Sequence, residues 1–267
     1  MEILVCIKQV PDDSVEVSLN KETGKAAIEK IAPIVNAFDG YALEMATRFK
    51  EANGGNITVV SVGPEKARDS LRSCCAVGAN KAFLVNDEAT KGADTYATAY
   101  TLSKAVAKIE EENGVKFDII FCGKETTDFT SSQVGPMLAE ILGLPQVTNI
   151  VELNPKDGGL EIKQETDEGY NLVDVATPCV VTVGKPSYDP RYPTMKNKMA
   201  ARKVQIPDLT AADMGADASL MGEAAAKVKC VKVYEPAKKE AGVKIKEKTV
   251  EETVAKAVGI MLDAKVF

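Results

Sequence analysis

The stretch "FDIIFCGKETTDFTSSQVGPMLAEIL", residues 117–142, combines an apolar run, a polar loop and a helical pattern in immediate succession. A short, continuously apolar run is typical of a strand that is covered on both faces of a sheet. The loop that follows is rich in Gly, Thr and Ser, and we expect a helix to begin near Gln133. The stretch therefore predicts one strand–loop–helix unit of an α/β fold, with a candidate ligand loop at the end of its strand.

The same alternation of strand and helix runs through the first half of the chain. Asp39, Pro64 and Asp94 are candidate helix starts, and three glycines are candidate helix stops. The pattern predicts a doubly wound, mostly parallel sheet of the α/β class. The expected strands are 2–10, 56–63, 81–87 and 117–123, the expected helices are 39–52, 65–77, 94–112 and 133–142, and the glycines are Gly54, Gly78 and Gly114.

The pattern changes near Thr148. The runs "TNIVELN" and "LEIKQET" are separated by the turn signal "PKDGG", which predicts a β-hairpin that extends the same sheet in antiparallel fashion. After Gly184 come three prolines, a basic segment and a small, polar tail that ends in the amphipathic run "VEETVAKAVGIMLDA". We therefore expect an α/β domain over 1–190, a basic loop over 191–207 and an extended C-terminal arm over 208–267 that packs on another chain.

Composition and charge exclude several classes of function. The 267 residues have a formal net charge of −6, which argues against a nucleic-acid partner. No run approaches the length of a membrane span and the N-terminus lacks the pattern of a signal peptide, so we expect a cytoplasmic protein. The chain contains no histidine, and its six cysteines form no C-x-x-C pair. Histidine-based catalysis is thereby excluded, and we expect neither a metal site nor a catalytic residue.

Three loops that follow expected strands combine small residues, hydroxyls and lysines: "CIKQVPD", "VGPEK" and "GKETTDFTSSQVG". Ligands of open α/β sheets bind beyond the carboxyl ends of the strands, so these loops together indicate a nucleotide. Neither G-x-G-x-x-G nor G-x-x-x-x-G-K-[ST] is present, which argues against an NAD-dependent dehydrogenase and a P-loop NTPase. Ser131 and Ser132 have an alternative role as caps of the next helix. Because Ser131, Ser132 and Gln133 all fall at one helix entrance, we favour ligand binding.

Five landmarks in this order resemble the β subunit of electron transfer flavoproteins, and the similarity spans essentially the whole chain. The landmarks are "VCIKQVPD" (5–12), "VNAFDGYALEMA" (35–46), "VVSVGPEKARDSLRSCCAVGAN" (59–80), "GKETTDFTSSQVGPMLAEILGLPQVT" (123–148) and "PCVVTVGKPSYDPRYPTMKNKMAARK" (178–203). The resemblance implies an adenine-nucleotide-binding, HUP-like fold. It also implies a heterodimer with an α subunit that holds the electron-transferring FAD.

The resemblance leaves two nucleotides open for this chain. Respiratory members hold AMP, whereas bifurcating members of anaerobes hold a second FAD that takes electrons from NADH and divides them between ferredoxin and the α-subunit flavin. Lys124 and Thr130 depart from the Arg and Asp that are frequent in bifurcating relatives. The runs "QVPD", "NAFDGYALE", "GADTYAT" and "SSQVGP" are closer to the anaerobic group, so we favour FAD over AMP.

The family's nucleotide pocket can be transferred residue by residue onto this chain. Gly123 permits close backbone approach, Lys124 supplies a positive charge, and the residues before the helix supply donors to phosphate. Asp39 is expected to accept from a ribose hydroxyl or to cap the following helix, and Asp94 and Thr95 to reach the flavin or to cap theirs. The expected cofactor-binding residues are Cys6, Asn36, Ala37, Phe38, Asp39, Val62, Thr95, Gly123, Lys124, Thr127, Asp128, Thr130, Ser131, Ser132, Gln133, Val134 and Gly135.

The basic loop matches the family's partner-recognition loop. Met195 stands where the family has its apolar anchor for acyl-CoA dehydrogenases, and we expect Tyr192, Lys196 and Met199 to bind the partner with it. A solvated basic loop is the alternative. For the whole chain, the alternative from another class is a nucleotide-responsive binding protein or ATP-using enzyme of the same superfamily.

Overall fold

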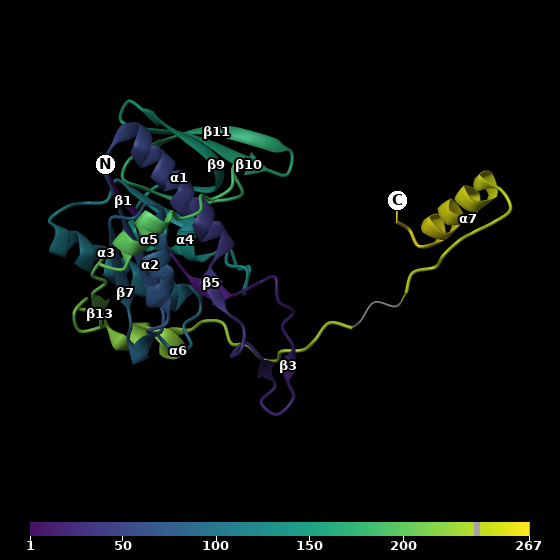
Figure 1. Cartoon of the computed structure of the whole chain (residues 1–267), viewed down its shortest axis with the longest axis horizontal. Coiled ribbons are helices and arrows are strands. Elements are labelled where there is room, and N and C mark those ends of the chain that lie inside the picture. The colour runs from purple at the N-terminus through teal and green to yellow at the C-terminus, as the bar shows by residue number, and fades with distance from the viewer. Residues whose placement is uncertain (238–240, 267) are drawn as a thin grey trace.

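The computed structural model describes residues 1–237 and 241–266. Its centre is a nine-stranded sheet. Neighbouring strands are parallel except at one edge, where three strands within residues 146–176 form two antiparallel pairs. The predicted α/β class is thereby confirmed (Figure 1). The strand order is β11 (Gly169–Ala176), β10 (Gly159–Thr166), β9 (Gln146–Lys156), β12 (Cys179–Val183), β8 (Ile119–Gly123), β1 (Glu2–Cys6), β6 (Asn56–Val62), β7 (Lys81–Val85) and β13 (Asp208–Leu209).

Helices cover both faces of the sheet, and each face has its own apolar core. On one face, α1 and α2 pack against strand residues such as Ile3, Ile57 and Phe121. On the other, α3 and α4 pack against Leu4 and Ile120. This two-sided burial explains why the central strands are almost continuously apolar. The helices are α1 (Ala37–Asn53), α2 (Ala67–Val77), α3 (Thr95–Asn113), α4 (Val134–Leu142), α5 (Met195–Ala201), α6 (Gly222–Ala225) and α7 (Val250–Asp263), with short 3₁₀ turns at η1 (Glu88–Thr90) and η2 (Ala218–Leu220).

Most predicted helix ends are confirmed. Asp94 caps α3 by accepting from the backbone N–H of Ala97, and Gly54, Gly78 and Gly114 lie at the C-caps of α1, α2 and α3. The prediction that Asp39 caps the first helix is wrong. The N-cap of α1 is Asn36, and Asp39 lies inside the first turn with its side chain directed to other partners.

The predicted hairpin is present as β9 and β10, and "YNLVDVA" adds β11 at the sheet edge. The chain then returns through β12, which lies between β9 and β8 and is parallel to both. The first strand is shorter than the expected 2–10. It ends at Cys6, and Gln9–Pro11 forms β2, which pairs with β5 (Pro33–Val35) in a separate two-stranded sheet beside another formed by β3 (Leu19–Asn20) and β4 (Lys25–Ala26).

The C-terminal segment begins differently from the expected arm. Residues 208–226 lie against the α/β domain, because β13 extends the sheet and Met214, Met221 and Ala225 are buried. From Lys227 onward most described residues are exposed, and α7 lies apart from the body (Figure 1). Residues 238–240 and 267 of the expected arm lie outside the described residues. The arm-like part therefore begins near 227 and not at 208.

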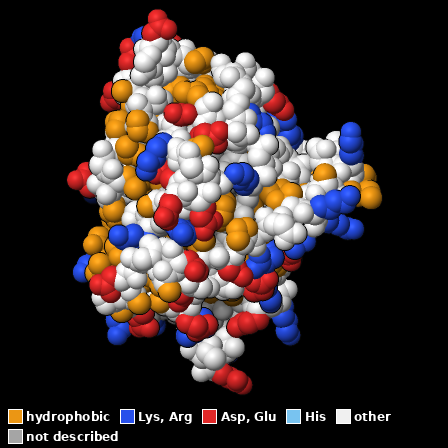
Figure 2. All heavy atoms as spheres, turned by 90° about the vertical axis from the view of Figure 1, so that its left-hand side faces the viewer, with side chains coloured by type: hydrophobic (Ala, Val, Ile, Leu, Met, Phe, Trp, Pro, Cys, Tyr) orange, Lys and Arg blue, Asp and Glu red, His pale blue; other side chains and the backbone are white. Residues whose placement is uncertain are grey.

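The surface charge on one side of the molecule and the character of the described helices bear on the expected classes of partner. Over residues 1–237 and 241–266, no helix combines the length and the apolar character that crossing a bilayer requires. On the side of the molecule in Figure 2, acidic and basic side chains are interspersed, with hydrophobic side chains scattered among them. That mixture agrees with the small negative net charge.

Candidate functional site

The candidate site lies at the carboxyl ends of β1 and β8, where the strand order reverses. β1 lies between β6 and β8, and the chain leaves β1 toward α1 on one face and leaves β8 toward α4 on the other. Connections that diverge in this way leave room between them beyond the strand ends. The loop 124–133 therefore lies where an open α/β sheet binds its ligand.

Asp39 joins the two strand ends. Its Oδ2 accepts from the backbone N–H of Lys8 at 2.7 Å, and its Oδ1 accepts from the backbone N–H of Gly123 at 3.1 Å. The residue is only 5% exposed, so burial raises the pKa of this carboxyl to about 7, while the donors from Lys8, Asn36 and Gly123 oppose the shift. Asp39 thus forms the floor of the site, and its pairing with a ribose hydroxyl stays a prediction.

Asn36 fixes the loop itself. Its side-chain amide donates to the carbonyl oxygen of Glu125 at 2.8 Å, and its Oδ1 accepts from the backbone N–H of Thr127 at 3.1 Å. The residue is fully buried. Because Asn36 is the N-cap of α1 and Asp39 lies in its first turn, the N-terminal end of this helix holds both Gly123, where the loop begins, and the loop residues Glu125 and Thr127.

The loop ends in a strained approach to α4. Thr130 and Ser132 have positive φ angles of 47° and 53°, which costs a non-glycine residue roughly 1–2 kcal/mol. Such strain is typical of functional sites, where the surrounding structure maintains it. Among the residues that the structure describes, no side chain caps α4. The alternative in which Ser131 and Ser132 simply cap this helix is therefore wrong. The N–H groups of Val134 and Gly135 stay available to a ligand, whereas Pro136 has no N–H and that of Met137 donates to the Gln133 carbonyl oxygen.

The hydroxyls near this helix entrance form a polar rim. The Ser132 hydroxyl donates to Glu125 at 2.7 Å, and the Thr95 hydroxyl donates to the side-chain oxygen of Gln133 at 2.9 Å. Ser131 is exposed. Gly135 packs so closely on β12 that a Cβ there would meet Thr182 Cγ2 at 2.4 Å. These residues fit an anionic, hydroxyl-bearing ligand, because the site combines free N–H donors, hydroxyls and close backbone approach.

The remaining expected residues line the same edge at different depths. Cys6 is buried at the end of β1, Val62 lies half-buried at the end of β6, and the Lys124 backbone donates to Val183 of β12. The start of α1 supplies Ala37, which is exposed, and Phe38, whose ring packs edge-on against Tyr41. The side chains of Val62 and Ala37 are hydrocarbon and cannot hydrogen-bond to the loop, so these two residues are the peripheral members of the expected set.

Sequence reasoning missed Lys8. Its ammonium group pairs with Asp128 at 2.6 Å and lies 4.8 Å from the ring centroid of Phe129, which is itself 74% exposed. The signal was present in "CIKQVPD", since Lys8 follows the first strand. Lys8 therefore ties the far side of the loop to the end of β1.

Comparison with known proteins identifies the family. The electron transfer flavoprotein domain model matches residues 24–214. The chain belongs to the electron transfer flavoprotein β-subunit family. It is 38% identical to the electron transfer flavoprotein subunit beta of Megasphaera elsdenii over 92% of both chains, and 40% identical to that of Thermoanaerobacterium thermosaccharolyticum over 91% of both. It is also 34% identical to the caffeyl-CoA reductase–Etf complex subunit CarD of Acetobacterium woodii over 97% of both.

The expected recognition residues of this β-subunit chain lie on and before α5. Tyr192, Met195 and Met199 are 94%, 74% and 64% exposed, and Lys196 is exposed beside them. Three large apolar side chains without cover form a surface that is unusual for a solvated loop. Their role in binding a partner stays a prediction.

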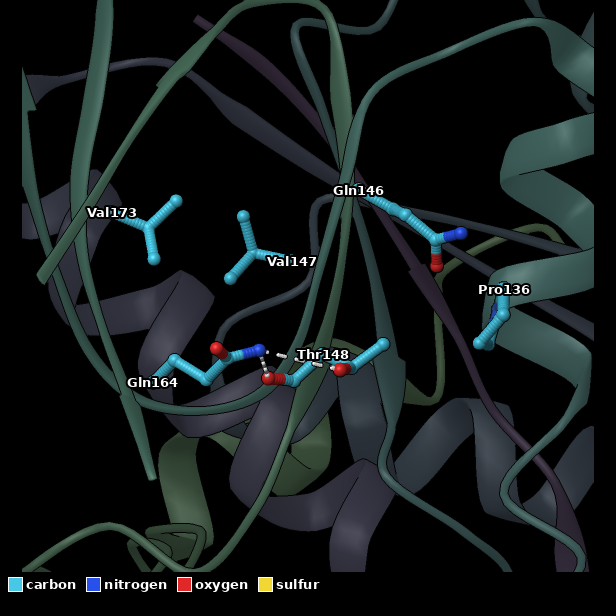
Figure 3. A pocket seen from close by; sticks show the side chains of 6 residues that line it. All are labelled: Pro136, Gln146, Val147, Thr148, Gln164 and Val173. Carbon is cyan, nitrogen blue, oxygen red and sulfur yellow. Dashed lines mark hydrogen bonds between the residues drawn. The ribbon is translucent and has the colours of Figure 1, made fainter. Parts of the chain in front are cut away.

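An open pocket of ≈400 Å³ lies elsewhere, between the start of α4 and the strands β9, β10 and β11 (Figure 3). Gln164 donates there to the carbonyl oxygen of Thr148 at 2.9 Å, and Val147 and Val173 line the apolar side. None of the predicted site residues lines this pocket. In this flavoprotein-family chain, the donors gather at the loop 124–133, so we assign no ligand to the pocket.

Proposed function

We propose that the chain is the β subunit of an electron transfer flavoprotein, that it pairs with a flavin-bearing α subunit, and that it binds an adenine nucleotide where β1 and β8 end. The observation that best supports the nucleotide site is the N-terminus of α4, whose first turn has no side-chain cap. The loop that leads to it contains two non-glycine residues with positive φ angles, Thr130 and Ser132. A loop that only connected a strand to a helix would not require that strain.

The nucleotide that we favour is a second FAD. The N–H groups of Val134 and Gly135, with Ser131 and Gln133, would hold its pyrophosphate, while Asn36 and Asp39 keep the loop in place. The flavin, when bound, would supply electron transfer in single and paired steps. In this proposal, electrons come from NADH and are divided between ferredoxin and the α-subunit flavin. One alternative is that the same site binds AMP. The second alternative is that the chain is a nucleotide-responsive binding protein that works without a flavin.

The proposed electron-transfer partner is an acyl-CoA dehydrogenase or a similar enzyme. The name of the Acetobacterium woodii relative places that protein in a complex with a reductase of a CoA thioester. The exposed apolar residues before and on α5, flanked by Lys196, Lys198, Arg202 and Lys203, suit an acidic docking surface with an apolar centre. On α7, Val254, Val258 and Leu262 are exposed, so we propose that this helix and the segment from 227 pack on the α subunit.

The nucleotide site is tested by the double substitution Ser131→Ala with Gln133→Ala in the heterodimer. Loss of one hydrogen bond to a charged group costs about 1.5–3 kcal/mol, roughly ten- to a hundredfold in affinity. We therefore expect one of two flavins to be lost in gel filtration, with the α-subunit flavin retained. The matched control is Ser187→Ala with Gln205→Ala, which removes the same groups outside the loop.

The flavin count distinguishes the alternatives. Two flavins retained by the loop variant would contradict the site. One flavin in the wild type, with AMP in its extract, would show that the pocket is right and the favoured nucleotide wrong. A heterodimer without any flavin would favour the binding-protein alternative.

The docking surface is tested by Met195→Ala. Truncating an exposed apolar anchor at the centre of an interface costs about 1–2 kcal/mol, so the KM for a purified acyl-CoA dehydrogenase is expected to rise about five- to thirtyfold. Bound nucleotide and flavin should be unchanged. Val15→Ala, at an exposed apolar residue far along the chain, should leave the KM unaltered; equal KM values for wild type and Met195→Ala would place the docking surface elsewhere.

A further inference from the structure

The segment between Arg191 and Ile206 is poorly supported by packing. Of the seven residues of α5, all of which the structure describes, only Ala201 is buried. Beneath the helix lies a hollow of ≈270 Å³ whose lining includes Thr47, Lys50, Asn197 and Ala200. α5 lies against α2, but most of its side chains are exposed, so contacts at the two ends of the segment also contribute to its orientation.

An arginine clamp holds the first end. The Arg191 guanidinium lies between two carboxylates of α1, with Nε 2.8 Å from Glu44 Oε2 and Nη2 3.0 Å from Glu51 Oε2. The backbone N–H of Arg191 also donates to Glu44, at 3.2 Å. The Glu44 side chain is only 2% exposed, so the clamp is anchored in the body of the domain. A planar guanidinium that binds two carboxylates fixes direction as well as position.

A second clamp holds the other end. Arg68 of α2 donates through Nη1 to the carbonyl oxygen of Ile206 and through Nη2 to Asp208, at 2.8 Å for the latter. Its Nε lies 2.6 Å from Glu65 of the preceding loop, and its side chain is 17% exposed. The chain thus meets a fixed arginine contact immediately before Tyr192 and again at Ile206 and Asp208.

We propose that Arg191 and Arg68 are positioning residues that preset the segment 192–205 for docking. The inference rests on the proposed function, since that segment is the proposed docking surface. Both guanidinium groups are occupied by partners within the chain, so neither binds the dehydrogenase itself. A surface that is ordered before association loses less conformational freedom when it docks, and this lowers the cost of binding. The clamps therefore set the affinity for the partner without touching it.

The experiment uses the purified heterodimer with Arg191→Gln, Arg68→Gln and both together. With a purified short-chain acyl-CoA dehydrogenase as the probe, each single substitution is expected to raise the KM about tenfold and to leave kcat unchanged. Trypsin cleavage after Lys196 and Lys198 in the free heterodimer should become about tenfold faster. Arg191→Lys should give intermediate values, because an ammonium group cannot bind both carboxylates in a fixed plane.

The matched control is Lys185→Gln, which removes one positive charge just upstream, from an exposed residue outside both clamps. It should change neither the KM nor the cleavage rate. If Arg191→Gln fails to fold, Glu51→Gln weakens the same clamp from its exposed side and serves as the second variant.

The outcomes separate this inference from the proposed function. Unchanged trypsin cleavage in the clamp variants would overturn the inference and leave the docking surface intact. Faster cleavage of the arginine variants with an unchanged KM would also overturn the inference. If Met195→Ala then leaves the KM unchanged in the same assay, the assignment of the docking surface is itself wrong. Faster cleavage together with a raised KM supports the inference.

Discussion

Asp39→Asn is expected to loosen the junction between β1 and β8 and to release the bound nucleotide. A carboxyl group presents two acceptor oxygens to the N–H groups of Lys8 and Gly123, whereas an amide presents one oxygen and one donor. One backbone N–H would then face an NH₂ group in a buried position. An unsatisfied buried donor costs about 1–3 kcal/mol, which urea unfolding of the heterodimer would measure.

Asp39→Asn should weaken nucleotide binding more than a substitution far from the site that lowers the free energy of unfolding by the same amount. The N–H of Gly123 begins the loop, so a displaced Gly123 misplaces every donor that follows it. We expect loss of the β-subunit nucleotide in gel filtration. Asp12→Asn is the matched control, because Asp12 is not buried and its carboxylate accepts hydrogen bonds from Ser14, two residues on. A stable Asp39→Asn heterodimer with full nucleotide content would contradict the role of Asp39.

The buried carboxyl also predicts a pH dependence for this junction. The pKa of Asp39 is about 7 in the folded chain, against an ordinary value of 3.8. Between these values the folded state binds the proton more tightly than the unfolded state, so the free energy of unfolding falls as pH rises from about 4 to about 7. The slope attributable to this group approaches about 1.4 kcal/mol per pH unit midway between the two pKa values. The difference in unfolding free energy between wild type and Asp39→Asn should therefore be larger at pH 5 than at pH 8.

Gly123→Ala is the second substitution with a large expected effect. A Cβ on Gly123 would meet Asp39 Oδ1 at 2.3 Å and the backbone of Phe38 and Asp39 at 2.9 Å. The backbone of α1 cannot move aside without breaking the contacts of Asn36 and Asp39. Overpacking of this kind costs about 1–3 kcal/mol, so we expect a lower free energy of unfolding and loss of the β-subunit nucleotide.

Gly40→Ala is its matched control. Gly40 lies in α1, one residue from Asp39, and a Cβ there would meet only Pro190 Cγ at an ordinary 3.8 Å. Because Ala is favoured over Gly inside a helix, the control should be neutral or slightly stabilising, by up to about 1 kcal/mol. If Gly123→Ala unfolds at the same urea concentration as Gly40→Ala, the close approach at Gly123 does not limit the site.

Local sequence signals predicted the secondary structure well where they act alone. Asp94, Gly54 and Gly114 mark helix ends because capping depends on neighbours within a few residues. The hairpin around "PKDGG" was readable for the same reason. The start of the first helix was mispredicted because Asp39 has the composition of a cap, and its partners Lys8 and Gly123 are 31 and 84 residues away.

The burial of the C-terminal residues 208–226 was also not predictable from the local sequence. Residues 208–226 contain too few apolar side chains to form a core of their own, which predicted an arm. Met214 and Met221 are nevertheless buried, because they complete the core that α3 already covers. Whether a segment is buried depends on its own side chains and also on the apolar surface that the rest of the domain presents to it.

The sequence by itself determined the α/β class, the position of the hydroxyl-rich loop after a buried strand and the family, because periodicity, capping and motif order are local properties of the chain. Only the tertiary structure decided that Asp39 and Asn36 clasp the loop, that Ser131 and Ser132 leave α4 uncapped, and that Arg191 and Arg68 hold the two ends of one segment. Each of these contacts, apart from the cap, joins residues that are 31 to 147 positions apart. Such pairs are brought together by the packing of helices on the sheet, and no local pattern records which distant donor a buried carboxylate or guanidinium will meet.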